Sequence, residues 1–195
     1  MVDKPAGLLS VPGRGAGKED SLSARVQNEF PDALSVHRLD MNTSGLLMFA
    51  RGKEIHRRLS RSFRERMINK CYVAMVAGLV EIDVGEVDLP LGQDWPNRPK
   101  QKVDFCGGKR SLTRYRVLAR DAVKNSSRVE LEPVTGRTHQ LRVHLSAIGH
   151  PIIGDGLYGE DTVCKTERLM LHSRLLGFPH PLSGETLTFT CEPPF

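Results

Sequence analysis

The sequence predicts an α+β fold, with a mixed, mostly antiparallel β-sheet flanked by a few helices and loops. Three observations support this prediction. Several segments with strand-like alternation follow one another, only one helical segment is long, and strands and helices do not alternate as they do in a doubly wound fold. The chain contains no internal repeat or charge-rich linker, so we expect one domain over residues 1–195.

Helices are expected at three places. Ser21 follows an aspartate and precedes apolar residues at helical spacing, so a short capped helix is expected up to Phe30. Lys53–Met67 is expected to form the long helix, because its apolar residues recur at a four-residue step on an otherwise cationic segment. His139–Ile148 is predicted to form a third helix, which Gly149 closes.

Strands are expected wherever apolar residues are continuous or alternate with polar ones. The segment between Leu89 and Gly108 is rich in Pro and Gly and is expected to be a loop bounded by short strands. The strand segments are Gly45–Ala50, Cys71–Ala77, Ser111–Leu118, Arg128–Glu132 and Thr186–Cys191.

Positive charge is concentrated in two segments. The whole chain carries a net charge of +5, whereas residues 51–70 alone hold eight Lys or Arg and two Glu, a local charge of 8 − 2 = +6. A second basic segment is Arg98–Lys102. One such segment is typical of a solvated helix face, but two of them indicate a polyanionic partner such as nucleic acid.

Metal ligands and membrane segments are not evident. The four cysteines, of which Cys191 is the last, form no C-x-x-C pair, so we expect reduced, mostly buried thiols. His172 has no acidic or cysteine partner at ligand spacing, and no metal is expected. No apolar run approaches the roughly 20 residues that cross a bilayer, and no signal peptide is evident. A cytoplasmic protein without membrane contact is expected.

Two polar segments carry candidate catalytic residues. In Ser35–Gly45 an acid enters a tight polar turn, where neighbouring amides can keep Asp40 ionised, as an attacking carboxylate must be. The alternative is that Asp40 only caps a turn. Thr135–His144 places Arg137 and Arg142 near a helix start, where guanidinium groups can pair with a buried carboxylate or clamp phosphates, or can be ordinary surface arginines.

These segments resemble motifs of the RluA-type pseudouridine synthases. His37–Gly45 resembles H-R-L-D-x-x-T-S-G, and Gly136–His144 resembles the family's third motif, which Gly149–Asp155 follows. Asp3–Gly7 is similar to N-K-P-x-G, with Asp in place of the usual Asn, and Lys70–Tyr72 is similar to the K-x-Y strand. The motifs occur in the family's order, so the resemblance implies the pseudouridine synthase fold with a central active-site cleft.

The resemblance implies an isomerase that converts uridine in structured RNA to pseudouridine. This reaction breaks a C–N glycosidic bond, turns the base and joins its C5 to the ribose without redox change, so no cofactor is expected. Asp40 would be the catalytic carboxylate, acting on the ribose or on the uracil ring. Arg142 would pair with Asp40 and keep it ionised. Tyr72 would stack on the uracil and help to remove the C5 proton.

RNA contacts are expected from the resemblance and from the basic segments. The target base must leave its stack, at a cost of a few kcal/mol, and Arg38 is the family's candidate for filling the gap. The other residues expected to bind RNA are His37, Arg61, Arg64, Arg98, Lys100, Lys102 and Arg137.

Asp94–Val103 carries a narrower resemblance, to an insertion of the family member that modifies a tRNA anticodon stem-loop (position 32) and a 23S rRNA hairpin (position 746). We therefore expect these RNAs as partners of a monomer. We also expect the family's N-terminal edge strand to be missing and no S4-like domain to help hold the RNA.

Three alternatives remain open at this point. The first is a synthase acting on a different rRNA site, and the second is a non-catalytic RNA-binding protein of the same fold. The third is a metal-dependent nuclease or phosphotransfer enzyme that uses Asp40.

Overall fold

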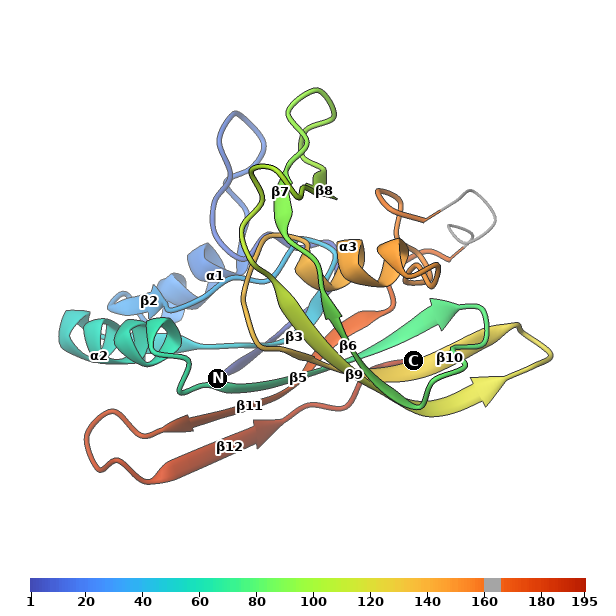
Figure 1. Cartoon of the computed structure of the whole chain (residues 1–195). Helices are drawn as coiled ribbons and strands as arrows, with labels where there is room; N and C mark the ends of the chain where they lie inside the picture. Colours follow the sequence, from blue (N-terminus) through green and yellow to red (C-terminus); the bar gives the residue numbers. More distant parts are fainter. Residues whose placement is uncertain (160–165) are drawn as a thin grey trace. The chain divides into compact units, whose positions relative to one another are not determined.

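The computed structural model of the chain describes residues 1–159 and 166–195 (Figure 1). These residues form two compact units. Unit 1 comprises Met1–Lys70 and His172–Phe195, and unit 2 comprises Cys71–Leu171. Antiparallel pairs outnumber the one parallel pair described below, and three helices accompany the strands, so the predicted α+β class is confirmed. One domain over 1–195 stays a prediction. No helix of the described ranges has the length and apolar character needed to cross a membrane.

Unit 1 contains a mixed sheet and a small ribbon. Strand β1 (Val2–Lys4) pairs antiparallel with β3 (Ser44–Leu47), which pairs parallel with β11 (Leu171–Pro179). Strand β12 (Thr186–Thr190) pairs antiparallel with β11. The ribbon joins β2 (Ala33–Ser35) to β4 (Phe49–Arg51), and helices α1 (Leu22–Glu29) and α2 (Lys53–Arg64) pack beside it (Figure 1).

The apolar face of α2 closes the core of unit 1. Ile55, Leu59 and Phe63 pack against the apolar side chains of β3, β4 and β11, as their four-residue spacing predicted. The predicted extension of this helix to Met67 is wrong. The helix ends at Arg64, Arg66 takes a left-handed conformation with φ of 60°, and the side chain of Met67 is exposed.

The predicted strand Gly45–Ala50 is two strands, β3 and β4. The break lies at Met48, whose N–H donates to His37 Nε2 and whose carbonyl accepts from Val36 N. The chain therefore changes partner at Met48, and a single apolar run serves two different sheets. Apolar runs reveal burial but do not show which strand pairs with which.

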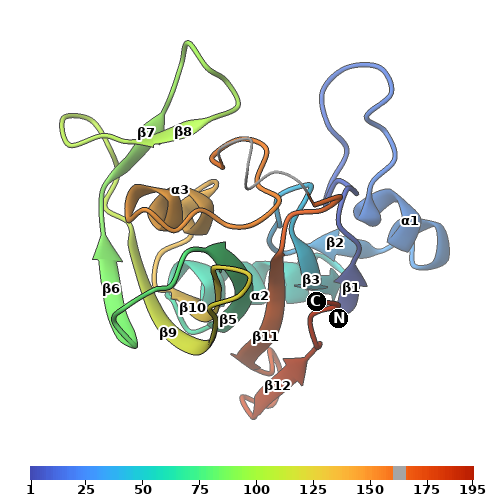
Figure 2. The ribbon, with the colours of Figure 1, turned by 90° about the vertical axis from the view of Figure 1, so that its right-hand side faces the viewer.

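Unit 2 contains an antiparallel sheet in the order β5 (Asn69–Ala77, which begins at the end of unit 1), β10 (Ser126–Pro133), β9 (Leu112–Asp121) and β6 (Val84–Asp88). Helix α3 (Gln140–Ala147) lies across one face (Figure 2). Its Leu141 and Leu145 pack on Val129 and Leu131 of β10. The Pro- and Gly-rich segment forms a hairpin of β7 (Leu91–Gln93) and β8 (Gln101–Val103), as predicted.

The cysteine prediction is only partly right. Cys71, Cys106 and Cys191 are free thiols. Cys106 is exposed and the other two are partly buried, so "mostly buried" is wrong for these three. The prediction for Cys164 falls outside the described residues. Cys106 lies in the turn after β8, where two backbone N–H groups bond to Asp104 and hold the loop at the surface.

Candidate active site

Asp40 lies in the turn between β2 and β3, and the N-terminal segment holds this turn. Gly7 N donates to the carbonyl of Met41 at 2.9 Å. The Ser10 hydroxyl donates to the carbonyl of Leu39 at 2.7 Å and accepts from the same residue's N–H at 3.0 Å. Asp40 itself is partly buried, and its carbonyl accepts from Thr43 N at 3.1 Å. The backbone around the acid is therefore fixed on both sides.

The ammonium of Lys4 is buried beneath this turn. Its Nζ donates to three carbonyl oxygens, of Pro5 at 2.8 Å and of Leu8 and Met41 at 2.7 Å each. Burial lowers the pKa of Lys4 to about 8, although the negative charges of Asp40 and Asp3 act in the opposite direction. At neutral pH, Lys4 therefore ties the N-terminal motif to the Asp40 turn and keeps a positive charge near that acid.

His37 is part of the framework of the turn. Its Nε2 accepts the N–H of Met48 at 3.0 Å, and its ring stacks on Phe63 with 4.8 Å between the centroids. Burial, together with the positive charge of Lys70, lowers the pKa of His37 to about 4, so the imidazole is neutral at pH 7. The neighbouring Arg38 is exposed. The predicted RNA contacts of both residues stay predictions.

A steric constraint explains why the motif of the Asp40 turn ends in a glycine, Gly45. Gly45 adopts a φ of 106°, and a Cβ on this residue would overlap the backbone of Ser173 in β11. The preceding Ser44 hydroxyl lies 2.8 Å from Nδ1 of His172, also in β11. The motif therefore ends where β3 pairs with β11.

Arg142 of α3 forms a buried ion pair in unit 2. Its Nε and Nη2 donate to the two carboxylate oxygens of Asp155 at 2.8 and 2.7 Å, and the side chains are 3% and 0% exposed. Asp155 also accepts the N–H groups of Leu157 and Tyr158. No role was predicted for Asp155, although this residue ends the motif that follows the third motif. The pairing of Arg142 with Asp40 stays a prediction.

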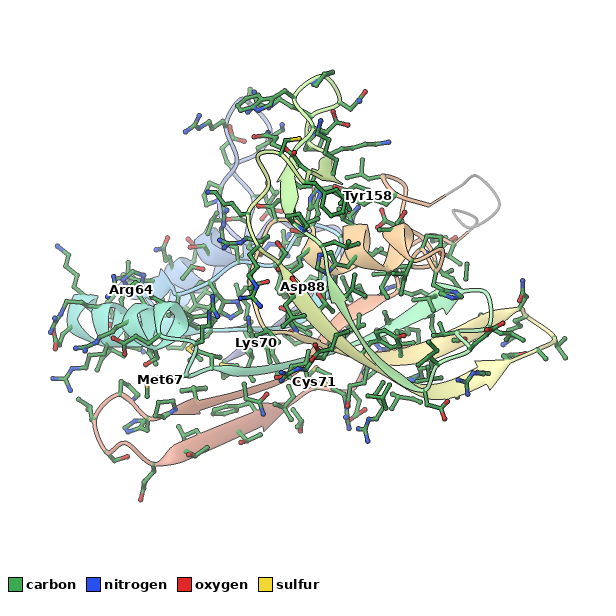
Figure 3. All side chains as sticks on the ribbon, viewed as in Figure 1. Arg64, Met67, Lys70, Cys71, Asp88 and Tyr158 are labelled. Carbon is green, nitrogen blue, oxygen red and sulfur yellow. The ribbon has the colours of Figure 1, made fainter. Side chains whose placement is uncertain are left out.

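Two tyrosines occupy different positions in unit 2. Tyr72 lies on β5 opposite Leu131, is partly buried and packs against the core; its catalytic role stays a prediction. Tyr158, which the sequence analysis missed, lies near α3 (Figure 3). Its hydroxyl accepts Gln101 N at 2.7 Å and lies 2.6 Å from Nδ1 of His139, the residue that precedes α3. Tyr158 thus fixes the start of β8 to α3.

The cations of α2 are exposed, but acidic neighbours pair with several of them. Arg61 pairs with Glu65 at 2.7 Å, and Arg57 and Arg58 pair with Glu54. Arg64 makes no ion pair with any residue of the described ranges and lies at the end of the helix (Figure 3). Arg61 and Arg64 are the predicted RNA-binding residues of this helix. Of the two, only Arg64 has a charge that no acidic side chain in the described ranges compensates.

The β7–β8 hairpin combines positive charge with an exposed aromatic ring. The guanidinium of Arg98 lies 4.5 Å from the centroid of the Trp95 ring, which is 65% exposed. Lys100 is partly exposed and Lys102 is exposed. Arg137, before α3, is exposed as well, and its Nε donates to the carbonyl of Arg110. Indole and guanidinium planes of this kind can stack on unpaired bases.

Along the sequence His172 has no acidic or cysteine partner at ligand spacing, but the fold brings two such residues next to it. In unit 1 the ligand atoms of His172, Asp3 and Cys191 all lie within 4.8 Å of one another. These residues lie far apart in the sequence and meet only because β1, β11 and the end of β12 belong to one sheet. Spacing rules compare near neighbours along the chain and could not detect this group.

Comparisons with known proteins agree with the motifs. Residues 1–147 match the model of the RNA pseudouridylate synthase family. The whole chain is 52% identical to the "Dual-specificity RNA pseudouridine synthase RluA" of Yersinia pestis, covering 95% of that protein, and 50% identical to the protein of the same name from Escherichia coli K12, covering 89% of it.

Two human structures are similar as well. RNA Pseudouridylate Synthase Domain Containing 1 has a TM-score of 0.79 and 33% identity over 90% of this chain and 75% of that one. RNA Pseudouridylate Synthase Domain Containing 4 has a TM-score of 0.77 and 26% identity over 98% of this chain and 84% of that one. Because the family model matches most of the residues and a relative is 52% identical over the full length, this chain belongs to the RNA pseudouridylate synthase family and is an isomerase that acts on RNA.

Proposed function

We propose that Asp40 is the catalytic carboxylate of this pseudouridine synthase, acting on the ribose or on the uracil ring of a flipped uridine. One observation carries the proposal: the Asp40 turn is fixed by Gly7, Ser10 and the Lys4 ammonium. Such a turn presents a carboxylate at a defined position. The overall change breaks the bond from N1 to C1′, forms one from C5 to C1′ and moves the C5 proton to N1.

Two further residues are proposed to act with Asp40. Arg142 supplies a guanidinium whose orientation the bidentate bond to Asp155 fixes. We propose that it pairs with the Asp40 carboxylate in the reaction. Tyr72 is proposed to stack on the uracil and to help remove the C5 proton. The partly exposed position of Tyr72 on a strand is compatible with this role.

The proposed RNA substrates are a tRNA anticodon stem-loop and a 23S rRNA hairpin, since the similar proteins are named as dual-specificity enzymes. In both RNAs the loop bases are available for stacking, and the hairpin offers Trp95 and Arg98 for that purpose. Arg38 is proposed to fill the gap left by the flipped base. His37 is proposed to contact the RNA through its neutral ring. The phosphates are proposed to contact Arg61, Arg64, Lys100, Lys102 and Arg137. The protein is proposed to act as a cytoplasmic monomer.

The decisive experiment replaces Asp40→Asn in the full chain. Pseudouridine-specific chemical mapping of tRNA and rRNA transcripts should show no product, whereas RNA affinity should stay within several-fold. The matched control is Asp20→Asn, which removes an exposed acid paired with Arg25 in the same unit and should leave turnover unchanged. An active Asp40→Asn enzyme would refute the role of Asp40. RNA binding without product in the unmodified chain would instead favour a non-catalytic RNA-binding protein.

The target assignment has a separate test, Trp95→Ala. Loss of one stacked base lowers RNA affinity by about 1–3 kcal/mol, and this loss should be seen with both stem-loops but not with an RNA of paired bases only. Phe105→Ala, at another exposed aromatic residue beyond the hairpin, is the comparison variant. Equal affinity of Trp95→Ala and the unmodified chain would remove the hairpin from base recognition. Cleaved RNA in an EDTA-sensitive reaction would favour a metal-dependent nuclease.

A further inference from the structure

Three residues of unit 1 form a group with the chemistry of a metal site. Asp3 lies in β1, His172 begins the part of β11 in unit 1, and Cys191 follows β12 directly. One carboxylate oxygen, one ring nitrogen and one sulfur lie within 4.8 Å of one another. A tetrahedral ion with bonds of about 2.0–2.3 Å holds its ligand atoms about 3.3–3.7 Å apart. Side-chain movements of about 1 Å therefore suffice to close the group around an ion.

The backbone that carries these residues is fixed. Asp3 is paired with Leu46 of β3, and His172 is paired with Ser44 of the same strand. Cys191 N donates to the carbonyl of Arg174 at 2.8 Å, which continues the β11–β12 ladder past the last paired residue of β12. Ligands on paired strands keep their relative positions better than ligands on loops do. The three ligands are therefore already brought together before any ion binds.

His172 has the support that metal-binding histidines usually have. The residue is 1% exposed, its Nδ1 lies 2.8 Å from the Ser44 hydroxyl, and its Nε2 lies 3.1 Å from the carbonyl of Cys191. The nitrogen on the Cys191 side is thus Nε2. If the ring proton moves from Nε2 to Nδ1, the Ser44 hydroxyl can accept it in a hydrogen bond, and the Nε2 lone pair can coordinate an ion. No net proton leaves the imidazole in this change.

The charges of the other two ligands favour a cation between them. The Cys191 thiol donates a hydrogen bond to the Asp3 carboxylate. A divalent ion would replace that proton: Cys191 releases one proton, and one carboxylate plus one thiolate balance the charge of the ion. Asp3 stands where the family's N-K-P-x-G motif usually has Asn. The negative charge at this position is therefore a feature of this chain.

We propose that Asp3, His172 and Cys191 bind a divalent ion of the zinc class, with water completing the coordination. A nitrogen, a sulfur and an oxygen ligand together suit Zn²⁺ or Co²⁺ and disfavour Mg²⁺ and Ca²⁺, which take oxygen ligands. The ion would connect β1, β11 and the end of β12 and would stabilise the sheet next to the Asp40 turn. The proposal is independent of the proposed catalytic roles.

The test titrates the full chain, first stripped with EDTA, with Co²⁺ and with Zn²⁺. Co²⁺ should produce a sulfur-to-cobalt charge-transfer band, and Zn²⁺ should compete for the site and raise Tm. Cys191→Ser should lose the band, and Asp3→Asn should bind at least about tenfold more weakly. Cys106→Ser, which removes an exposed thiol elsewhere, is the matched control and should behave like the unmodified chain.

Two results would overturn the metal site. One is an unmodified chain that gives no band and no Tm shift with excess ion. The other is a band that persists in Cys191→Ser or disappears in Cys106→Ser. The buried His172 is left unchanged in these variants, because its replacement could unfold unit 1. The readout is ion binding and not turnover, so its failure leaves the proposed function untouched.

Discussion

Units 1 and 2 each bury a cation, and they stabilise it in different ways. In unit 1, three neutral carbonyl oxygens accept from Lys4; in unit 2, the Asp155 carboxylate accepts from Arg142 in a bidentate pair. Carbonyl dipoles solvate a charge without cancelling it, whereas a carboxylate compensates it and fixes its orientation. From this comparison we expect Lys4 to act mainly through its electric field near Asp40, and Arg142 mainly through the fixed orientation of its guanidinium.

The largest expected effect comes from Asp155→Asn. This change removes the Asp155 charge that pairs with the buried guanidinium of Arg142, so the free energy of unfolding should fall by about 3–5 kcal/mol. Urea unfolding of the full chain measures the change. Because the pair is buried, the loss should be nearly independent of salt concentration.

The control for this prediction is Glu86→Gln. Glu86 pairs with Arg114 of the same unit at 2.7 Å, but both side chains are more than half exposed. Its loss should cost no more than about 1 kcal/mol. If both variants lose the same stability, burial does not distinguish the two pairs, and the role given to Asp155 fails.

Lys4→Met should have the next largest effect. It removes the buried ammonium that donates to three carbonyl oxygens, so the free energy of unfolding should fall by about 1–3 kcal/mol. It also removes the positive charge near Asp40, and turnover should fall about tenfold, equivalent to about 1.4 kcal/mol in the barrier. Single-turnover rates at saturating enzyme separate this effect from RNA binding. Loss of stability with unchanged turnover would reduce Lys4 to a structural residue.

The low pKa of Lys4 gives this prediction a pH dependence. The pKa is about 8 in the folded chain and 10.5 without burial, so the unfolded chain binds more protons between these values. The Lys4 contribution to stability should therefore rise with pH over this window, while turnover falls as its charge is lost above about pH 8. Both dependences should be absent in Lys4→Met, and a wild-type profile in that variant would exclude Lys4 as their source.

A pH-dependent effect is expected from His37→Gln, whose amide oxygen can still accept the N–H of Met48. The pKa of His37 is about 4 in the folded chain and 6.5 unperturbed, so the unfolded chain binds more protons as pH falls through this range. This residue alone lowers the free energy of unfolding by up to about 1.4 kcal/mol per pH unit between these values. Urea unfolding from pH 7 to pH 4 should show a shallower decline in the variant; parallel curves would contradict a lowered pKa of His37 in the folded chain.

The smallest effect concerns exposed cations. Arg64→Ala should reduce the slope of log affinity against log salt by about 0.7–0.9, the value for one phosphate contact. Arg61→Ala should reduce it less, because Glu65 already compensates that charge. RNA-binding titrations at several salt concentrations test this order. Equal slopes in both variants and the unmodified chain would remove α2 from the RNA footprint.

Local patterns in the sequence predicted most elements of the fold. The cap at Ser21, the apolar spacing in α2 and the strand segments of unit 2 identify elements that the structure contains. What the patterns missed depends on tertiary pairing. The end of α2 follows from the left-handed Arg66, and the division of one apolar run into β3 and β4 follows from the bonds of Met48 with His37 and Val36.

The residues of the candidate site show the same difference between local patterns and tertiary contacts. The Asp40 turn and Arg142 were found because their motifs are local. Asp155, the buried partner of Arg142, had no assigned role. The sequence alone does not show which arginine pairs with a given carboxylate. Tyr158 and the group of Asp3, His172 and Cys191 were missed for the same reason: side chains distant in the chain meet only when the strands and helices pack.

The contact between Gly45 and Ser173 has a consequence for protein engineering. Because any side chain at position 45 would collide with the main chain of the adjacent strand, a library that randomises the Asp40 turn should return only glycine there among its folded members. Neighbouring exposed positions such as Met41 should accept many residue types. Selection for folding alone, with no substrate present, would thus reproduce part of the family's sequence motif.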